Sequence, residues 1–194
     1  MDLTQIAQRE RVVGHGRISL IEMPTFEERK LLCQMMQADE IWQKLALDEP
    51  PKPGRLNLAF ENGYHEAFFI RFEPQAKIAG FILLHTAKRK REGIVEVDIA
   101  VTDPEIRKQK IALEACFALF HHTLDKGYCQ TLWAWLDKDN MPSANLIRSL
   151  GVTVIEQEEK GNTAYGEVET IEVRLTYDEW QALKTKRNLV FEDA

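Results

Sequence analysis

The chain has 194 residues, of which 44% are hydrophobic and 29% carry a charged side chain, an ordinary composition for one globular core. Its formal net charge of −6 argues against a generic binder of nucleic acid or anionic membranes, and suits either an amine-bearing partner or mere solubility. The N-terminal segment lacks the apolar stretch of a signal peptide, and no apolar run approaches the length that spans a bilayer. We therefore expect neither secretion nor membrane insertion.

The three cysteines, Cys33, Cys116 and Cys129, form no C-x-x-C pair and no metal-ligand cluster with the five histidines. Cys116 and Cys129 lie in apolar stretches, which favours reduced core residues. We expect a cytoplasmic protein without a metal site.

The first ninety residues predict helices and an antiparallel hairpin. Thr25 can cap a helix whose first turn is acidic, and the prolines and glycine of 50–54 predict an irregular segment. The Lys88–Gly93 stretch predicts a solvated turn. The expected strands are Arg17–Met23, Ala67–Phe72 and Lys77–Thr86, and the expected helices run from Thr25 to about Gln37 and from Asp39 to Leu47.

The centre of the chain predicts a strand, a basic loop and a long helix. Residues Val95–Val101 alternate between apolar and polar, the pattern of a half-buried strand, and Pro104 breaks this run. A helical period begins at Ile111 and ends near Gly127. The intervening loop, 105–110, carries three cations into a helix N-terminus and so predicts an anion-binding site.

The last third predicts a strand and helix pair, a hairpin and a final helix. Trp133 and Trp135 are expected to pack in the core, and Trp180 and Leu183 to dock the final helix. Because strands and helices alternate here, parallel strand pairing is expected. The expected strands are Thr131–Leu136, Val152–Gln157 and Tyr165–Tyr177, with a turn at Glu158–Asn162, helices at Pro142–Leu150 and Asp178–Lys186, and a loose tail from Asn188.

Two segments resemble motifs of the GNAT superfamily of N-acetyltransferases over about residues 15–177. The loop Arg107-Lys-Gln-Lys-Ile-Ala112 is similar to the family's pyrophosphate loop, with lysines at 108 and 110 where glycines are common. The later segment Asn140-x-x-Ser143-x-x-Leu146-x-x-x-x-Gly151 resembles the Ser form found among ribosomal-protein N-terminal acetyltransferases. The resemblance implies an α/β (α+β) fold in a single domain over 1–194. Its mixed central sheet would have about seven strands, flanked by helices on both faces.

The resemblance also implies acetyl-CoA as co-substrate and direct attack of a primary amine in a ternary complex. The amine would belong to a protein N-terminus or to a small molecule. Residues implied to bind the cofactor are Ile99, Ala100, Val101, Arg107, Lys108, Gln109, Lys110, Ile111, Ala112, Asn140 and Ser143.

Two acidic residues are the candidates for catalysis. Counting back from Arg107 places Glu96 where many members hold a catalytic glutamate, and Asp98 shares its face of the strand. A partly desolvated carboxylate beside the thioester could serve as the base. The alternative is that both carboxylates face solvent or pair with basic residues. Ile147 stands where the family often has a tyrosine, so a thiolate would leave unprotonated.

Other interpretations of the sequence stay open. The loop substitutions fit a non-catalytic GNAT-fold binding or regulatory protein, because lysine does not supply the backbone freedom of glycine. A nucleic-acid binder using 88–91 and 107–110 ranks well below both. Ser143 could equally be a helix cap. The sequence does not name the acceptor amine, and it leaves the oligomeric state open, including a homodimer.

Overall fold

The computed structural model describes residues 2–38, 41–45, 47, 49–155, 160–163 and 166–193. All seven predicted strands are present in one mixed sheet, together with three short strands that the sequence pattern did not indicate. The strands are β1 (Val13–His15), β2 (Ile18–Glu22), β3 (His65–Phe72), β4 (Lys77–His85), β5 (Ile94–Val101), β6 (Thr131–Asp137), β7 (Thr153–Ile155), β8 (Lys160–Thr163), β9 (Gly166–Thr176) and β10 (Glu192–Asp193).

The strand order is β10-β1-β2-β3-β4-β5-β6-β9-β7, and β8 pairs with β9. Parallel pairing was predicted for the second half of the chain, but among the described strands β5 and β6 form the one parallel pair. The long strand β9 runs antiparallel between β6 and β7 and separates them. β9 has this direction because it follows β8 in the chain and pairs with it antiparallel.

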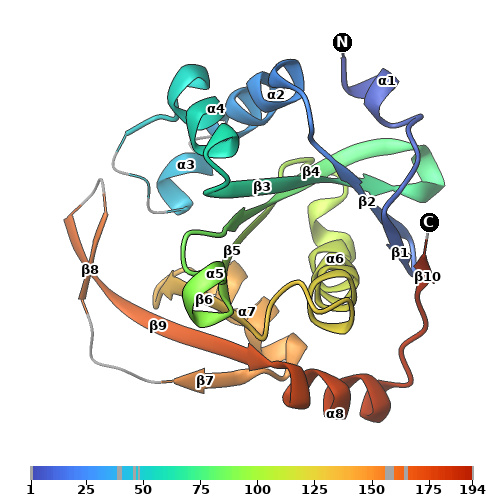
Figure 1. Ribbon diagram of the computed structural model, residues 1–194, viewed down its shortest axis with the longest axis vertical. Coiled ribbons are helices and arrows are strands. Elements are labelled where there is room, and N and C mark those ends of the chain that lie inside the picture. Colours follow the sequence, from blue (N-terminus) through green and yellow to red (C-terminus); the bar gives the residue numbers. More distant parts are fainter. Residues whose placement is uncertain are drawn as a thin grey trace.

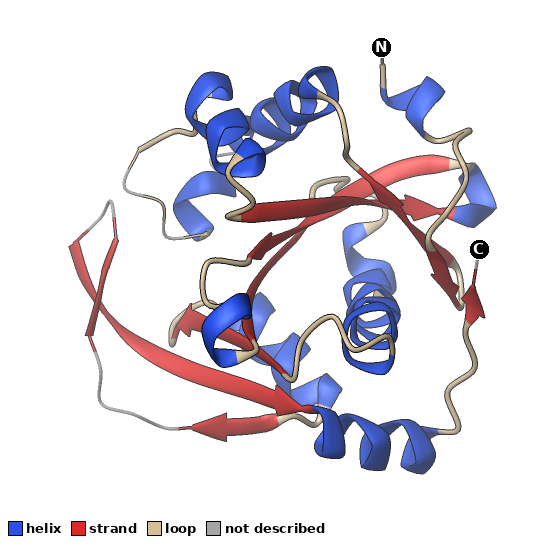
Figure 2. Ribbon diagram, in the orientation of Figure 1, coloured by secondary structure: helices blue, strands red, loops and turns tan. Residues whose placement is uncertain are grey.

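Helices cover both faces of the sheet, as predicted (Figures 1 and 2). Helices α2, α3 and α4 lie over one face of β3 and β4, and α6 lies against the other face. The α-helices are α1 (Leu3–Ile6), α2 (Phe26–Gln37), α3 (Ile41–Lys44), α4 (Pro53–Glu61), α5 (Arg89–Glu92), α6 (Ile111–Phe120), α7 (Met141–Leu150) and α8 (Tyr177–Arg187). Within the described part of the chain, no helix is long and apolar enough to cross a membrane.

Each face of the sheet carries its own apolar core. Against α6 lie the inward residues of β2 to β5, including Leu20, Ile82 and Val95, all fully buried. Against α2 and α4 lie the alternate residues, including Phe69 and Phe81. The period-2 alternation of the central strands thus divides their side chains between two cores.

The start of α2 confirms the predicted cap. Thr25 accepts a hydrogen bond from the Glu28 N–H at 3.3 Å, and the Glu28 side chain reaches back to the Thr25 N–H at 2.8 Å. Glu28 is fully buried, and Arg9 neutralises its carboxylate. This reciprocal arrangement satisfies two N–H groups that a helix end leaves free.

Several local predictions were wrong. The segment 50–54 is not irregular throughout, because α4 begins at Pro53, where a missing N–H leaves no bond unmade. The Lys88–Gly93 turn contains the short helix α5, which Gly93 ends at a φ of 68°. Lys160–Asn162, predicted as part of a turn, belongs to β8. Predictions for Asp39, for 156–159 and for Tyr165 fall outside the described residues.

The C-terminal segment is not loose, which corrects another prediction. Phe191 stacks on His121 at 4.3 Å between ring centroids and meets Trp180 at 5.8 Å. Beyond it, β10 pairs with β1 near the start of the chain. Aromatic packing therefore holds the C-terminal segment against the apolar core that contains α6.

Candidate active site

A gap opens in the sheet between β5 and β6. The two strands pair over Ile94–Glu96 and Thr131–Trp133, and the pairing stops there. β5 continues to Val101 beside β4 without a partner on its other edge. Every residue from Glu96 to Val101 is accordingly half-buried although β5 lies mid-sheet. The gap therefore exposes backbone hydrogen-bonding groups in the middle of the molecule.

Successive residues of a strand direct their backbone groups to opposite edges. The Thr102 N–H donates to the Ala79 carbonyl at 2.8 Å, so even-numbered residues of this strand turn toward β4. Of the three residues predicted to bind the pantetheine chain through backbone groups, Ile99 and Val101 face the gap. Ala100 directs its backbone toward β4 instead.

β4 approaches the end of β5 closely at one position. A Cβ on Gly80 would lie 2.1 Å from the Ala100 carbonyl oxygen. Glycine is required here because any side chain would push the two strands apart. This close contact with β4 fixes the position of the edge of β5 that faces away from the gap.

The basic loop follows β5 and leads into α6, as predicted. Arg107 Nε donates to the Val101 carbonyl at 3.0 Å and holds the loop against the strand end. Lys108, Gln109 and Lys110 are exposed, whereas Ile111 is buried and Ala112 half-buried. The first N–H groups of α6 have no acceptor within the helix, so this loop presents cations and N–H donors together.

Lys110 adopts a left-handed conformation with a φ of 63° just before α6. This is the position where the family's motif has glycine, the residue that adopts positive φ without strain. The backbone turn is therefore kept although the glycine is absent. A lysine in this conformation costs about 1–2 kcal/mol relative to an ordinary backbone.

Arg17 lies in the turn between β1 and β2 and braces the loop from there. Its Nη2 donates to the Gln109 carbonyl at 2.6 Å and to Glu114 at 2.5 Å. Glu114 lies in the first turn of α6, where its charge would oppose binding of an anion. The ion pair with Arg17 compensates that charge.

Asn140 begins α7 just after β6. Its side-chain oxygen accepts a hydrogen bond from the Ser143 N–H at 3.3 Å, so Asn140 is the helix cap, not Ser143. Because β5 and β6 are parallel, their carboxyl ends meet at the same edge of the sheet. The loop after β5 and the start of α7 therefore lie on the two strand ends that diverge at the gap.

A row of four polar or aromatic side chains crosses the sheet where the gap begins. His65, His85, Glu96 and Trp133 are direct partners on β3, β4, β5 and β6. Their side chains share the face covered by α2 and α4. Trp133, like Trp135 two residues on, is half-buried at this site, so the prediction that both tryptophans pack in the core was wrong.

The two predicted carboxylates have different surroundings. Asp98 accepts a hydrogen bond from His85 Nε2 at 2.8 Å. Burial lowers the pKa of His85, but the Asp98 hydrogen bond and charge outweigh this and raise it above its ordinary value. Burial raises the pKa of Glu96, and the nearby cations His85 and Lys88 only partly offset this. Asp98 is thus engaged by His85, whereas burial favours the protonated form of Glu96.

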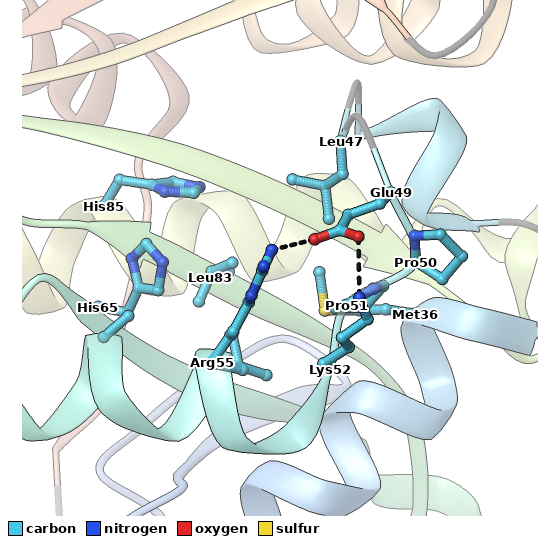
Figure 3. A pocket seen from close by; sticks show the side chains of 12 residues that line it. Met36, Leu47, Glu49, Pro50, Pro51, Lys52, Arg55, His65, Leu83 and His85 are labelled. Atoms are coloured by element: carbon cyan, nitrogen blue, oxygen red, sulfur yellow. Dashed lines mark hydrogen bonds and ion pairs between the residues drawn. The ribbon is translucent and has the colours of Figure 1, made fainter.

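A cavity of about 270 Å³ adjoins this row on the α2 and α4 side (Figure 3). His65 and His85 point into it from the sheet, and Glu49 and Arg55 pair with each other at its opposite side. The lining residues are Met36, Leu47, Glu49, Pro50, Pro51, Lys52, Arg55, Leu56, Ala59, His65, Leu83 and His85. Among the described residues, no cluster of histidine, cysteine or acidic side chains could hold a metal ion.

Residues 17–153 match the family model described as "Acetyltransferase (GNAT) domain". This chain belongs to the GNAT acetyltransferase family. The match covers most of the chain and includes the gap, the basic loop and Asn140. GNAT acetyltransferases use acetyl-CoA, and this family member is accordingly an acyltransferase.

Solved structures share the fold of this GNAT protein at low sequence identity. RimL, a ribosomal L7/L12 alpha-N-protein acetyltransferase in complex with coenzyme A, is 16% identical with a TM-score of 0.70, covering 88% of this chain and 99% of its own. A GCN5-related N-acetyltransferase from Brucella melitensis is 20% identical with a TM-score of 0.66, covering 93% and 86%. A chimera of the spermidine N-acetyltransferase SpeG from Vibrio cholerae and hSSAT is 11% identical with a TM-score of 0.67, covering 86% of this chain and 99% of its own. No curated protein sequence matches the chain.

The structure of this GNAT protein brings three further groups to the site that the sequence did not indicate. They are His65, His85 and the loop carrying Glu49. The sequence does carry a signal for His85. His85 is the last residue of β4, and the antiparallel pairing of β4 with β5 places it opposite Glu96. The position of Glu49 beside the sheet depends on tertiary packing and has no local signal.

Proposed function

We propose that this protein transfers an acetyl group from acetyl-CoA to a primary amine by direct attack within a ternary complex. The observation that carries the proposal is the gap between β5 and β6, whose strand ends lead into the basic loop and α7. The exposed edge of β5 can pair with an extended, amide-bearing chain such as pantetheine. The amine would belong to a small molecule or to a protein N-terminus.

The chain's residues fit the cofactor's phosphates. The positive φ of Lys110 preserves the turn that directs N–H groups toward a pyrophosphate. We assign phosphate binding to Arg107, Lys108, Gln109, Lys110 and the first N–H groups of α6, at Ile111 and Ala112. We assign pantetheine contacts to the backbone of Ile99 and Val101, and further cofactor contacts to Asn140 and Ser143.

The proposed chemistry needs one base. Glu96 takes a proton from the ammonium group, directly or through one water, and the freed nitrogen attacks the thioester carbonyl. The new C–N bond forms, the C–S bond breaks with its electron pair leaving on sulfur as a thiolate, and the second proton of the attacking nitrogen passes to water. The hydrogen bond from His85 to Asp98 fixes the imidazole in place beside Glu96.

The first prediction concerns binding of the cofactor. Millimolar CoA or acetyl-CoA should raise the melting temperature, because a ligand that binds the folded state stabilises it by mass action. Thermal scans with and without CoA, supported by calorimetric titration, measure this effect. No shift together with no heat of binding would contradict the assigned cofactor site.

The second prediction concerns the loop cations. Changing both Arg107 and Lys108 to Ala should weaken CoA binding by about 1–3 kcal/mol, because each cation can make a charge-assisted hydrogen bond to phosphate. Calorimetry at two salt concentrations should show a weaker salt dependence in the double variant. Changing the exposed Arg91 to Ala is the matched control. If the double variant bound CoA as tightly as the parent, the phosphates would lie elsewhere.

A further inference from the structure

We propose that the cavity beside His85 receives the apolar substituent of the acceptor amine. The preferred acceptor would be a monoamine whose substituent has about the size of a leucine or phenylalanine side chain. This inference rests on the proposed function and adds the class of substrate to it.

The position of the cavity relative to Glu96 supports this assignment. His85 lies directly opposite Glu96 on the adjacent strand, and His65 lies one strand further, opposite His85. Neighbouring strands are about 4.8 Å apart, so His65 lies roughly 10 Å from Glu96 across the sheet. An amine at Glu96 would therefore reach the cavity with a substituent about 5–10 Å long.

The walls of the cavity are mostly apolar. Helix α2 supplies Met36, and helix α4 supplies Leu56 and Ala59. The preceding loop adds one leucine and two prolines, and β4 adds Leu83. A volume of about 270 Å³ is below the range of typical pockets for drug-sized ligands, and suits a single side-chain-sized group.

The polar groups of the lining already have partners within the protein. Glu49, the one carboxylate among the described lining residues, accepts a hydrogen bond from Lys52 at 3.0 Å and pairs with Arg55. His85 is committed to Asp98. Burial, together with the nearby His85, lowers the pKa of His65, which therefore lines the cavity as a neutral ring.

These pairings disfavour a second positive charge on the acceptor. An ammonium group entering the cavity would lose its hydration and would meet the cations Lys52 and Arg55, which already pair with Glu49 there. A hydrocarbon group would lose only contact with water. The cavity therefore discriminates between a monoamine with an apolar substituent and a diamine of the same length.

The test measures kcat/KM of the parent protein for propylamine, hexylamine, phenylethylamine and hexamethylenediamine. Hexylamine should exceed propylamine by roughly 60-fold, since each of its three additional buried methylenes contributes about fourfold. Hexamethylenediamine, which matches hexylamine in length, should fall well below it. Peptides that begin with Leu or Ser form a second arm, and turnover confined to the Leu peptide would identify a protein N-terminus as the source of the amine.

A substitution in the cavity tests the same inference independently. Ala59→Phe should lower kcat/KM for hexylamine by about tenfold or more and leave propylamine within about twofold, because the ring fills the space for the substituent. Leu58→Phe, on the same helix but 56% exposed and outside the lining, is the matched control. Thermal melting of both variants checks that they fold.

The outcomes separate the inference from the proposed function. Equal kcat/KM across the amines, or a preference for the diamine, would overturn the inference and leave acetyl transfer intact. Turnover of no amine and no peptide, together with no binding of CoA, would overturn the proposed function and the inference with it.

Discussion

Glu96→Gln is expected to lower turnover by roughly two to four orders of magnitude near neutral pH, the usual contribution of a positioned base. Glutamine keeps the size and hydrogen bonding of the side chain but cannot accept the proton from the amine. Binding of acetyl-CoA should be nearly unchanged, because the assigned cofactor contacts lie at Ile99, Val101 and the loop after β5. Steady-state rates and calorimetric titration of the variant measure the two effects separately.

The pH dependence gives the same prediction a second readout. Burial holds the pKa of Glu96 above its ordinary value, so activity of the parent should fall as the pH falls through that raised pKa. The deficit of Glu96→Gln should shrink as the pH rises, because a larger fraction of the amine arrives without its proton. A deficit that is constant with pH would show that Glu96 is not the base.

Asp98→Asn is the matched comparison on the same strand. Asp98 is engaged by His85, so its loss should disturb the imidazole and cost less activity than the loss of Glu96. Asparagine can still accept a hydrogen bond from His85 Nε2. An active Glu96→Gln enzyme beside an inactive Asp98→Asn enzyme would reverse the assignment of the two carboxylates.

Trp180→Ala is expected to lower the free energy of unfolding by about 3–5 kcal/mol, a large share of the stability of an ordinary domain. Trp180 is fully buried and stacks on Phe117 with ring centroids 6.3 Å apart. It also meets Phe120 and Phe191, so its removal leaves a cavity where α8, α6 and the C-terminal segment join. Urea unfolding followed by circular dichroism measures the loss.

Tyr177→Ala, at the exposed start of the same helix, is the control for this stability prediction. Tyr177 is 46% exposed, so its truncation should cost far less. Equal losses for the two variants would mean that the aromatic cluster around Trp180 does not anchor the C-terminal helix.

The parts of the fold that were predictable depend on neighbours in the sequence. Alternation along β5 and the helix cap at Thr25 are local patterns, and both predictions are confirmed. The pairing of β1 with β10 joins residues near the two ends of the chain. Neither strand carries enough residues to show a period, so the sequence had no signal for it. The helix at Pro53 was missed because proline permits a helix start as well as a break.

The candidate site was likewise predictable only where a contiguous motif indicates it. The loop after β5 and the Asn140 segment are contiguous motifs, and the structure places them at the two strand ends beside the gap. His65 and His85 reach the site through strand register, and the half-buried setting of Trp135 depends on the strands diverging. These features follow from tertiary geometry, which no short motif encodes.

Acetyl transfer itself is the most direct test of this account. The measurement is release of free thiol from acetyl-CoA in the presence of protein and hexylamine, with N-acetylated product quantified by mass spectrometry. We expect thiol release that requires both protein and amine and that equals the amount of N-acetylated product. Binding of CoA with thiol release no faster than in the protein-free mixture, for the amine series and for the peptides, would contradict the account and favour a non-catalytic binding protein.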